Sequence, residues 1–208
     1  MNAQSANTVI VLDFETTGLS PNMGDRAIEI GAVKLEEGQV IDRFQELMNP
    51  GFRVSGFIES YTGITNKMLQ DAPPCNEVMD RFAGFIAGYN LVAHNASFDK
   101  RFLDGELNAI QRTYDGSFAC SMLIARRLYQ SAPNHKLGSL VKYKNIPNDG
   151  VFHRALADSE MTASLWLQML KDIDEQYELA APSFGLMRTL SRKPKHGVEK
   201  FLQDQAGQ

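Results

Sequence analysis

The chain has few cysteines and no long apolar run. Its two cysteines, Cys75 and Cys120, do not match any metal-ligand spacing, so we expect idle or buried thiols and no structural disulfide. No apolar run approaches the roughly 20 residues needed to span a membrane. The stretch 1–7 also lacks the charged and apolar pattern of a signal peptide. We therefore expect a cytoplasmic protein without membrane contact.

Excess positive charge is also absent. The 21 Lys and Arg residues face 25 Asp and Glu residues, which gives a formal net charge of −4. This balance argues against wide, non-specific coating of a nucleic-acid duplex, which needs many basic contacts. Four acids are candidate metal ligands, and the rest of the chain is neutral without them. A nucleic acid is therefore not excluded as a partner, but we expect it to be held locally.

What the chain does have is enough apolar content for one sizeable core. With 208 residues and 43% hydrophobic content, it can form one main domain followed by a short appendage. We expect the domain to span 1–175, with its core at about 8–172. We expect 176–208 to be a carboxyl-terminal tail that is partly helical or weakly ordered.

The stretch 9–19, Val-Ile-Val-Leu-Asp-Phe-Glu-Thr-Thr-Gly-Leu, organises this interpretation. Four aliphatic residues predict a central strand buried on both faces, with Asp13 and Glu15 at its carboxyl end. Because side chains alternate along a strand, both carboxylates should face one side while Phe14 enters the opposite layer. Such a pair suits a hard cation such as Mg²⁺ or Mn²⁺. A strand that ends in solvent with two hydrated acids is the alternative.

The remaining pattern predicts an α/β domain. Residues 27–35 and 40–48 form a hairpin around the turn 36–39, and 57–70 form short helical pieces. Further helices are expected at about 76–87, 120–129 and 155–173, with a shorter one starting near 135.

Two more polar clusters follow the first. His94 to Asp99 comes after a short strand, with Asn95 as a candidate N-cap and Asp99 in the first turns of a helix. Asp158 lies in the first turns of the long helix, and His153 lies just before it. Each residue alone has a simpler explanation, such as a helix-dipole acid for Asp99 or a surface histidine for His153. Together they predict convergence at one edge of an open sheet, where ligands bind.

These motifs resemble the DEDDh (DnaQ-like) superfamily of 3′-to-5′ exonucleases. The resemblance covers about 8–172 and is carried by Asp-Phe-Glu-Thr-Thr-Gly at 13–18, His-Asn-Ala-Ser-Phe-Asp at 94–99, and His153 followed five residues later by Asp158. The stretches 28–33 and 61–65 also match. The resemblance implies a ribonuclease H-like mixed sheet of about five strands, flanked by helices.

The resemblance also implies a mechanism. Asp13, Glu15, Asp99 and Asp158 would hold two Mg²⁺ or Mn²⁺ ions about 4 Å apart, one activating water and the other stabilising the leaving oxygen. His153 would accept the proton of that water. The expected products are 5′-mononucleotides released from single-stranded DNA 3′ ends, in proofreading or repair. Thr16, Leu19, Thr62 and Asn95 would contact the terminal nucleotide, although Leu19 has an equal alternative as a core residue of the turn.

Three questions stay open at the level of the sequence. The segment 183–197 carries four basic residues and no acid, so it is a candidate polymerase-docking peptide, a backbone-phosphate grip or a solvated end. The same catalytic residues fit a stand-alone exoribonuclease that trims RNA. A catalytically silent nucleic-acid-binding module is the third alternative, and the complete set of five catalytic-type residues argues against it.

Overall fold

Strand β1 (Val9–Thr16) forms the middle of the molecule. The computed structural model describes residues 4–148 and 153–207, so residues 1–3 and 208, at the ends of the expected domain and tail, lie outside the described residues. β1 pairs antiparallel with β2 (Ala27–Glu36) and parallel with β4 (Leu91–Ala93). With β3 (Gln39–Leu47) and β5 (Phe118–Cys120) outside them, the sheet order is β3-β2-β1-β4-β5. The predicted five-stranded mixed sheet is confirmed.

The β2–β3 hairpin follows from its turn residues. Glu37 and Gly38 both have positive φ, 50° and 78°, as a two-residue turn requires when it matches the twist of the flanking strands. The structure therefore places the turn of this hairpin within 36–39, as the sequence predicts.

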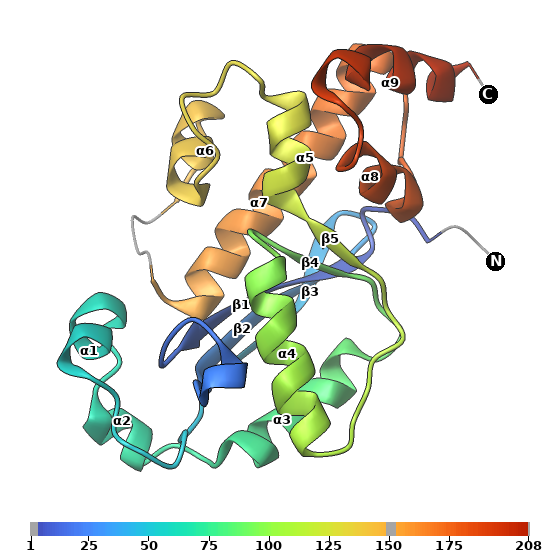
Figure 1. The fold of residues 1–208 in the computed structure, drawn as a ribbon. Coiled ribbons are helices and arrows are strands. Elements are labelled where there is room, and N and C mark those ends of the chain that lie inside the picture. Colours follow the sequence, from blue (N-terminus) through green and yellow to red (C-terminus); the bar gives the residue numbers. More distant parts are fainter. Residues whose placement is uncertain (1–3, 149–152, 208) are drawn as a thin grey trace.

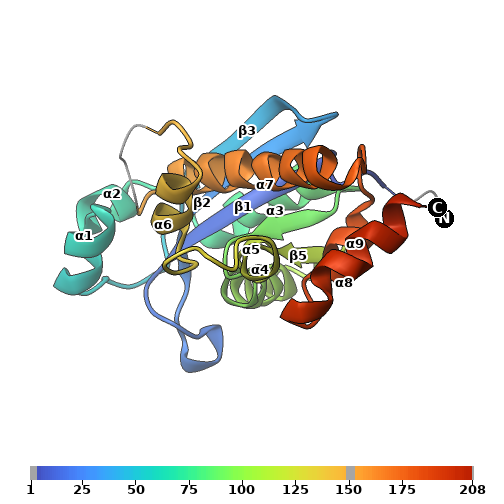
Figure 2. The same ribbon diagram turned by 90° about the horizontal axis from the view of Figure 1, so that it is seen from above.

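Helices cover both faces of the sheet (Figures 1 and 2). One face packs on α3 (Cys75–Ile86) and α4 (Ser97–Ala109). The other packs on the long helix α7 (Ala155–Tyr177), with α5 (Ser121–Leu128) and α6 (Leu137–Tyr143) beside it. The short helices are η1 (Pro21–Met23), α1 (Gly56–Thr62) and α2 (Asn66–Gln70). In the described part of the chain, no helix is long and apolar enough to cross a membrane.

The alternation along β1 divides the core in two. Val9 and Val11 belong to the cluster under α7, whereas Ile10, Leu12 and Phe14 belong to the cluster under α3 and α4. Aliphatic side chains thus leave both faces of β1, as expected for a central strand.

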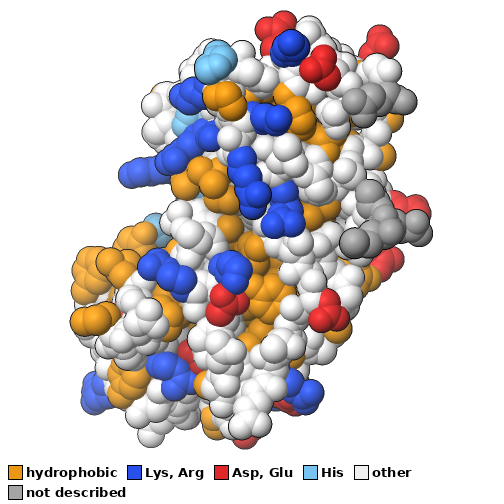
Figure 3. Space-filling view, turned by 45° about the vertical axis from the view of Figure 1, so that its right-hand side comes forward, with side chains coloured by type: hydrophobic (Ala, Val, Ile, Leu, Met, Phe, Trp, Pro, Cys, Tyr) orange, Lys and Arg blue, Asp and Glu red, His pale blue; other side chains and the backbone are white. Residues whose placement is uncertain are grey.

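The carboxyl-terminal segment packs against the α7 layer. It forms α8 (Phe184–Leu190), η2 (Lys195–Gly197) and α9 (Val198–Ala206). Five of its apolar side chains join the α7 core cluster: Phe184, Met187, Leu190, Val198 and Leu202. Its start pairs with the amino-terminal segment through a bridge between Ser5 and Ser183, and the buried indole of Trp166 donates to Ala6 O at 2.7 Å. On this side of the molecule, Lys and Arg side chains gather on the surface (Figure 3).

Candidate active site

Asp13 and Glu15 occupy the carboxyl-terminal half of β1 and share the face that packs on α7. Val9 and Val11 precede them with the same alternation, while Phe14 enters the opposite core, as the sequence predicts. The strand includes both acids, so it is longer than its aliphatic stretch. Its regular pairing with β2 shifts between Glu15 and Thr16, directly after the second carboxylate.

Asp99 reaches the same place from the other layer. It lies in the first turn of α4 with only 2% of its surface exposed. Its Oδ1 accepts the backbone N–H of Phe14 at 3.2 Å, which attaches the start of α4 to β1 between the two strand carboxylates. The backbone hydrogen bond therefore fixes Asp99 next to Asp13 and Glu15.

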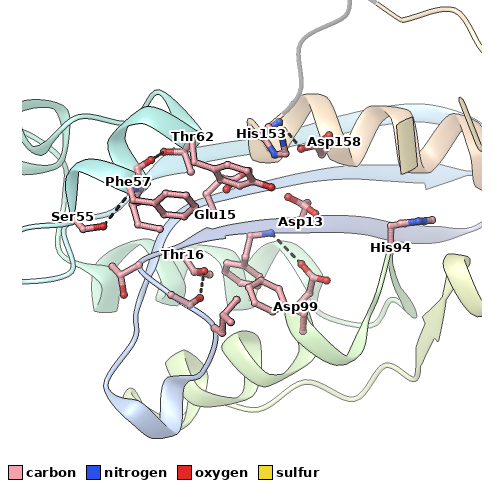
Figure 4. Close-up of a pocket in the computed structure, with 17 residues that line it drawn as sticks. Asp13, Glu15, Thr16, Ser55, Phe57, Thr62, His94, Asp99, His153 and Asp158 are labelled. Atoms are coloured by element: carbon pink, nitrogen blue, oxygen red, sulfur yellow. Dashed lines mark hydrogen bonds between the residues drawn. The ribbon is translucent and has the colours of Figure 1, made fainter. Parts of the chain in front are cut away.

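Asp158 and His153 come from the entry into α7. Asp158 lies in the first turn, and its Oδ2 accepts the backbone N–H of His153 at 2.9 Å. His153 has a φ of 61°, in the left-handed region that few non-glycine residues adopt. The hydrogen bond to Asp158 holds this unusual backbone and presents the exposed imidazole to the carboxylates (Figure 4).

Gly31 of β2 lets α7 approach the sheet this closely. A Cβ at this position would lie 2.1 Å from the backbone nitrogen of Leu156. The Ser159 hydroxyl also donates to Gly31 O at 2.9 Å. Because the first turn of α7 rests directly on the β2 backbone, Asp158 can reach the carboxylates of β1.

The five predicted catalytic side chains line one cavity of about 670 Å³ (Figure 4). They come from β1, α4 and the start of α7, which are far apart in the sequence. Other walls are formed by the turn after β1 and by α1. The lining residues are Asp13, Phe14, Glu15, Thr16, Thr17, Gly18, Leu19, Ser55, Phe57, Ile58, Tyr61, Thr62, His94, Phe98, Asp99, His153 and Asp158.

The four carboxylates are electrostatically costly when ionised together. Burial, followed by repulsion from Asp158, raises the pKa of Glu15 to about 8. Burial raises the pKa of Asp99 to about 7, against the effect of the Phe14 N–H. Burial and neighbouring acids raise the pKa of Asp13, and burial also raises that of Asp158. Such a group is stable in its charged form only with cations beside it.

The donor atoms fit hard divalent cations. Ligand atoms of Glu15, His153 and Asp158 all lie within 4.8 Å of one another, and carboxylate oxygens are the ligands that Mg²⁺ and Mn²⁺ prefer. The expectation of a metal site is therefore supported by both charge and donor chemistry.

Sequence reasoning did not identify the pair of Glu29 and Arg154. Glu29 is fully buried on β2 and accepts from the Arg154 guanidinium at 2.8 Å and from Ala155 N at 3.1 Å. This ion pair joins the start of α7 to β2. It also neutralises Arg154 within the pair, so that this neighbouring cation offers little compensation to the cavity acids.

An aromatic wall was also not assigned from the sequence. The Tyr61 ring lies 4.1 Å from the His153 ring between centroids, and Phe57 stacks on Tyr61 at 5.8 Å. Phe57 is 71% exposed and Leu19 is 77% exposed. The alternative interpretation of Leu19 as a core residue of the turn is therefore wrong. Tyr61 lies in the stretch 61–65, which matches the family, and this match was the signal in the sequence that could have identified it.

The predicted substrate-binding residues separate into two groups. Thr16, Leu19 and Thr62 line the cavity. The Thr16 hydroxyl donates to Gly18 O at 2.6 Å and that of Thr62 to Ile58 O at 2.9 Å, so both also stabilise the cavity wall. Asn95 is exposed and does not line the cavity.

The prediction of Asn95 as the N-cap of α4 is wrong. Ala96 occupies that position without a side-chain hydrogen bond. Asn95 instead has a φ of 69°, a left-handed conformation that asparagine tolerates well. Its preference for such turns outweighs its preference for capping here.

His94 has a different environment from His153. Its Nδ1 lies 2.8 Å from Ser121 Oγ, and its Nε2 lies 2.9 Å from His135 O. The carbonyl can only accept, so Nε2 carries a proton and donates it. Burial lowers the pKa of His94 to about 4, which leaves the ring neutral. His94 therefore joins β4 to α5 and to the segment before α6.

Comparison with known proteins agrees with this site. The exonuclease family RNase_T matches residues 10–166. The DNA polymerase III PolC-type protein of Bacillus subtilis is 41% identical over 172 residues, which cover 81% of this chain and 12% of that protein. The PolC-type protein of Caldanaerobacter subterraneus is 38% identical over 166 residues, 80% of this chain and 12% of that protein. The chain thus spans about an eighth of the length of these relatives.

Solved structures share the fold. Exonuclease X in complex with 5′ overhanging duplex DNA superposes with a TM-score of 0.67 at 25% identity, covering 88% of this chain and 99% of that chain. The nuclease domain of 3′hExo, a DEDDh family member bound to rAMP, has a TM-score of 0.69 at 23% identity, with 80% and 92% coverage.

Proposed function

This chain belongs to the RNase_T exonuclease family, and on that premise we propose that it is a DEDDh-type 3′-to-5′ exonuclease that uses divalent metal to release 5′-mononucleotides from single-stranded DNA. One observation carries the proposal. Four carboxylates from β1, α4 and α7 meet an imidazole in a single cavity, although each would be more stable apart.

The roles of the five residues follow from their surroundings. Asp13, Glu15, Asp99 and Asp158 are the proposed metal ligands, because their oxygens are crowded and have no cationic side chain paired with them among the described residues. When bound, Mg²⁺ or Mn²⁺ would neutralise these acids and supply the Lewis acid that phosphodiester hydrolysis needs.

His153 is the proposed general base. Its ring is exposed to the cavity and backed by Tyr61, while its backbone is fixed by Asp158. A neutral imidazole carries one unprotonated ring nitrogen, which can accept a proton from the attacking water. The neutral, fully hydrogen-bonded His94 is a poor candidate for this role.

The terminal nucleotide is proposed to bind against the apolar wall. Leu19 and Phe57 are exposed apolar side chains beside the carboxylates, and a base offers a flat partner of matching chemistry. Thr16 and Thr62 shape the same wall. Asn95 stays a prediction without geometric support.

The PolC-type relatives support DNA as the substrate and proofreading as the context, with a polymerase as a partner. We further propose residues 1–175 as the catalytic domain. A role of 176–208 in polymerase docking remains a separate hypothesis.

The test compares labelled single-stranded DNA and RNA in Mg²⁺, in Mn²⁺ and in EDTA. We expect mononucleotides from the 3′ end of DNA that require metal. Asp158→Asn should abolish release, whereas His153→Ala should lower the rate about a hundredfold and leave substrate binding in place.

The matched control is His196→Ala, which removes an exposed histidine outside the cavity and should retain the full rate. Faster cleavage of RNA would assign the chain to RNA trimming. Absence of metal-dependent mononucleotides from both substrates would leave the binding-module hypothesis.

A further inference from the structure

A basic face lies next to the active-site cavity. We define it by Lys100 of α4, Arg126 of α5, Arg188 of α8 and Arg192 directly after α8. Lys100, Arg188 and Arg192 line a shallow hollow of about 220 Å³ together with the hydroxyl residues Ser97 and Ser191. Leu123, one turn before Arg126 on α5, lines the same hollow. Figure 3 shows Lys and Arg side chains gathered on this side of the molecule, with few acids among them.

The arginines of this face are not neutralised within the described part of the chain. Elsewhere, five arginines contact a carboxylate: Arg26, Arg43, Arg81, Arg112 and Arg154. Arg188 instead donates to the Ser117 hydroxyl at 2.9 Å, and Arg126 donates to the sulfur of Met122 and forms no ion pair with a described residue. Arg192 is exposed and forms no ion pair with a described residue. Their guanidinium groups are therefore available for an external anion.

The basic face and the active site share a wall. In the first turn of α4, Phe98 and Asp99 line the cavity, while Ser97 and Lys100 line the hollow. Arg126 is also close enough to His94, on the cavity wall, to help lower the pKa of that ring. An anionic polymer that leaves the cavity past α4 thus meets arginines that no described carboxylate neutralises.

We propose that the basic face binds the phosphate backbone of the strand whose 3′ end occupies the active site. This inference rests on the proposed function. Guanidinium groups bind phosphate oxygens through paired hydrogen bonds, and the Ser97 hydroxyl adds a neutral donor, whereas the Ser191 hydroxyl already donates to Arg188 O at 2.7 Å. In a chain of net charge −4, this local cluster provides what the overall composition lacks. An acidic protein surface is the alternative partner, but the shared wall with the cavity favours the substrate strand.

The test compares a trinucleotide, which is too short to extend far beyond the cavity, with a single-stranded DNA dodecamer. The double variant Arg126→Gln/Arg192→Gln removes two exposed charges without breaking an ion pair among the described residues. We expect the ratio of the dodecamer KM to the trinucleotide KM to rise about tenfold. The slope of log(kcat/KM) against log salt for the dodecamer should become shallower by about 1.4, because each phosphate contact on a single strand contributes about 0.7.

The matched control is Lys67→Gln/Lys142→Gln, which removes from α2 and α6 two exposed charges that form no ion pair with a described residue. It should leave the KM ratio and the salt slope as in the wild type. A second variant, Arg188→Gln, should raise the ratio in the same direction, and circular dichroism will report whether each variant is folded.

An unchanged KM ratio in folded Arg126→Gln/Arg192→Gln would overturn the inference and point to an acidic protein partner. Failure of the proposed function has a different signature, because the wild-type protein would then release no mononucleotide even from the trinucleotide.

Discussion

The two histidines beside the cavity differ in what surrounds their rings. His153 is exposed and held by its backbone, whereas both ring nitrogens of His94 are hydrogen-bonded within the fold. One imidazole is therefore free to exchange protons, and the other stabilises the scaffold. The sequence places both in family-like motifs, and only the family resemblance, through His153 followed five residues later by Asp158, assigns the role of base to His153.

The pKa of His94, lowered to about 4, predicts a pH effect on stability. As pH falls below about 6.5, the unfolded chain takes up a proton that the folded chain accepts only near 4, so stability decreases through this window. A shift of this size corresponds to an effect on the order of 3 kcal/mol. Urea unfolding of wild type and His94→Gln from pH 7 to 4.5 should show their difference in unfolding free energy shrinking with acid. A constant difference would contradict the assignment.

For Asp13 we expect the opposite dependence of stability on pH. Burial and neighbouring acids raise its pKa, so the metal-free fold loses stability as pH rises from the ordinary aspartate range toward that raised pKa. In EDTA at pH 8, we expect Asp13→Asn to be more stable than wild type by about 1 kcal/mol or more, and inactive. Mg²⁺ should raise the melting temperature of wild type more than that of the variant.

Asp71→Asn is the control for this pair, because Asp71 is an exposed acid outside the cavity lining. It should change stability by less than about 0.5 kcal/mol in either buffer. A destabilised Asp13→Asn protein in EDTA would show that the crowded carboxylates are not under strain.

At the scale of elements, the contact of α7 with β2 decides whether the site forms. Gly31→Ala should cost about 1–3 kcal/mol, because its Cβ would lie against the Leu156 backbone and must displace α7. The displacement should also remove Asp158 from the cavity and abolish mononucleotide release. Chemical unfolding and the nuclease assay measure the two effects.

Gly84 provides the comparison within a helix. It is exposed on α3, and a Cβ added there would meet no described atom within 4 Å, so Gly84→Ala should stabilise the protein by up to about 1 kcal/mol and retain activity. Equal effects of the two substitutions would argue against close packing of α7.

Local patterns predicted most elements, and tertiary pairings could not be predicted. A run of four aliphatic residues identified β1, and the turn residues at 36–39 identified the β2–β3 hairpin. The predicted N-cap of α4 was wrong because asparagine favours both caps and left-handed turns. The ion pair of Glu29 and Arg154 joins residues 125 positions apart, and nothing in either neighbourhood specifies the partner. The same holds for the Tyr61 ring on His153.

At the scale of the whole molecule, the last helices belong to the α7 core. Leu190 is fully buried in that cluster, so Leu190→Ala should lower the free energy of unfolding by about 2–5 kcal/mol. Met23, which is 84% exposed, is the control, and Met23→Ala should change it by less than about 0.5 kcal/mol. Equal small effects in urea unfolding would mean that α8 does not pack stably in solution.

The alternation along β1 has a consequence for how this gene can vary. A deletion or insertion of one codon between Val9 and Phe14 would rotate every later side chain of the strand by half a turn. The acids would then point into the apolar layer of α3 and α4, and Phe14 would leave that layer for the α7 side of the sheet. Many single substitutions in β1 can be absorbed by repacking, but its length in codons is fixed by the chemistry at its end.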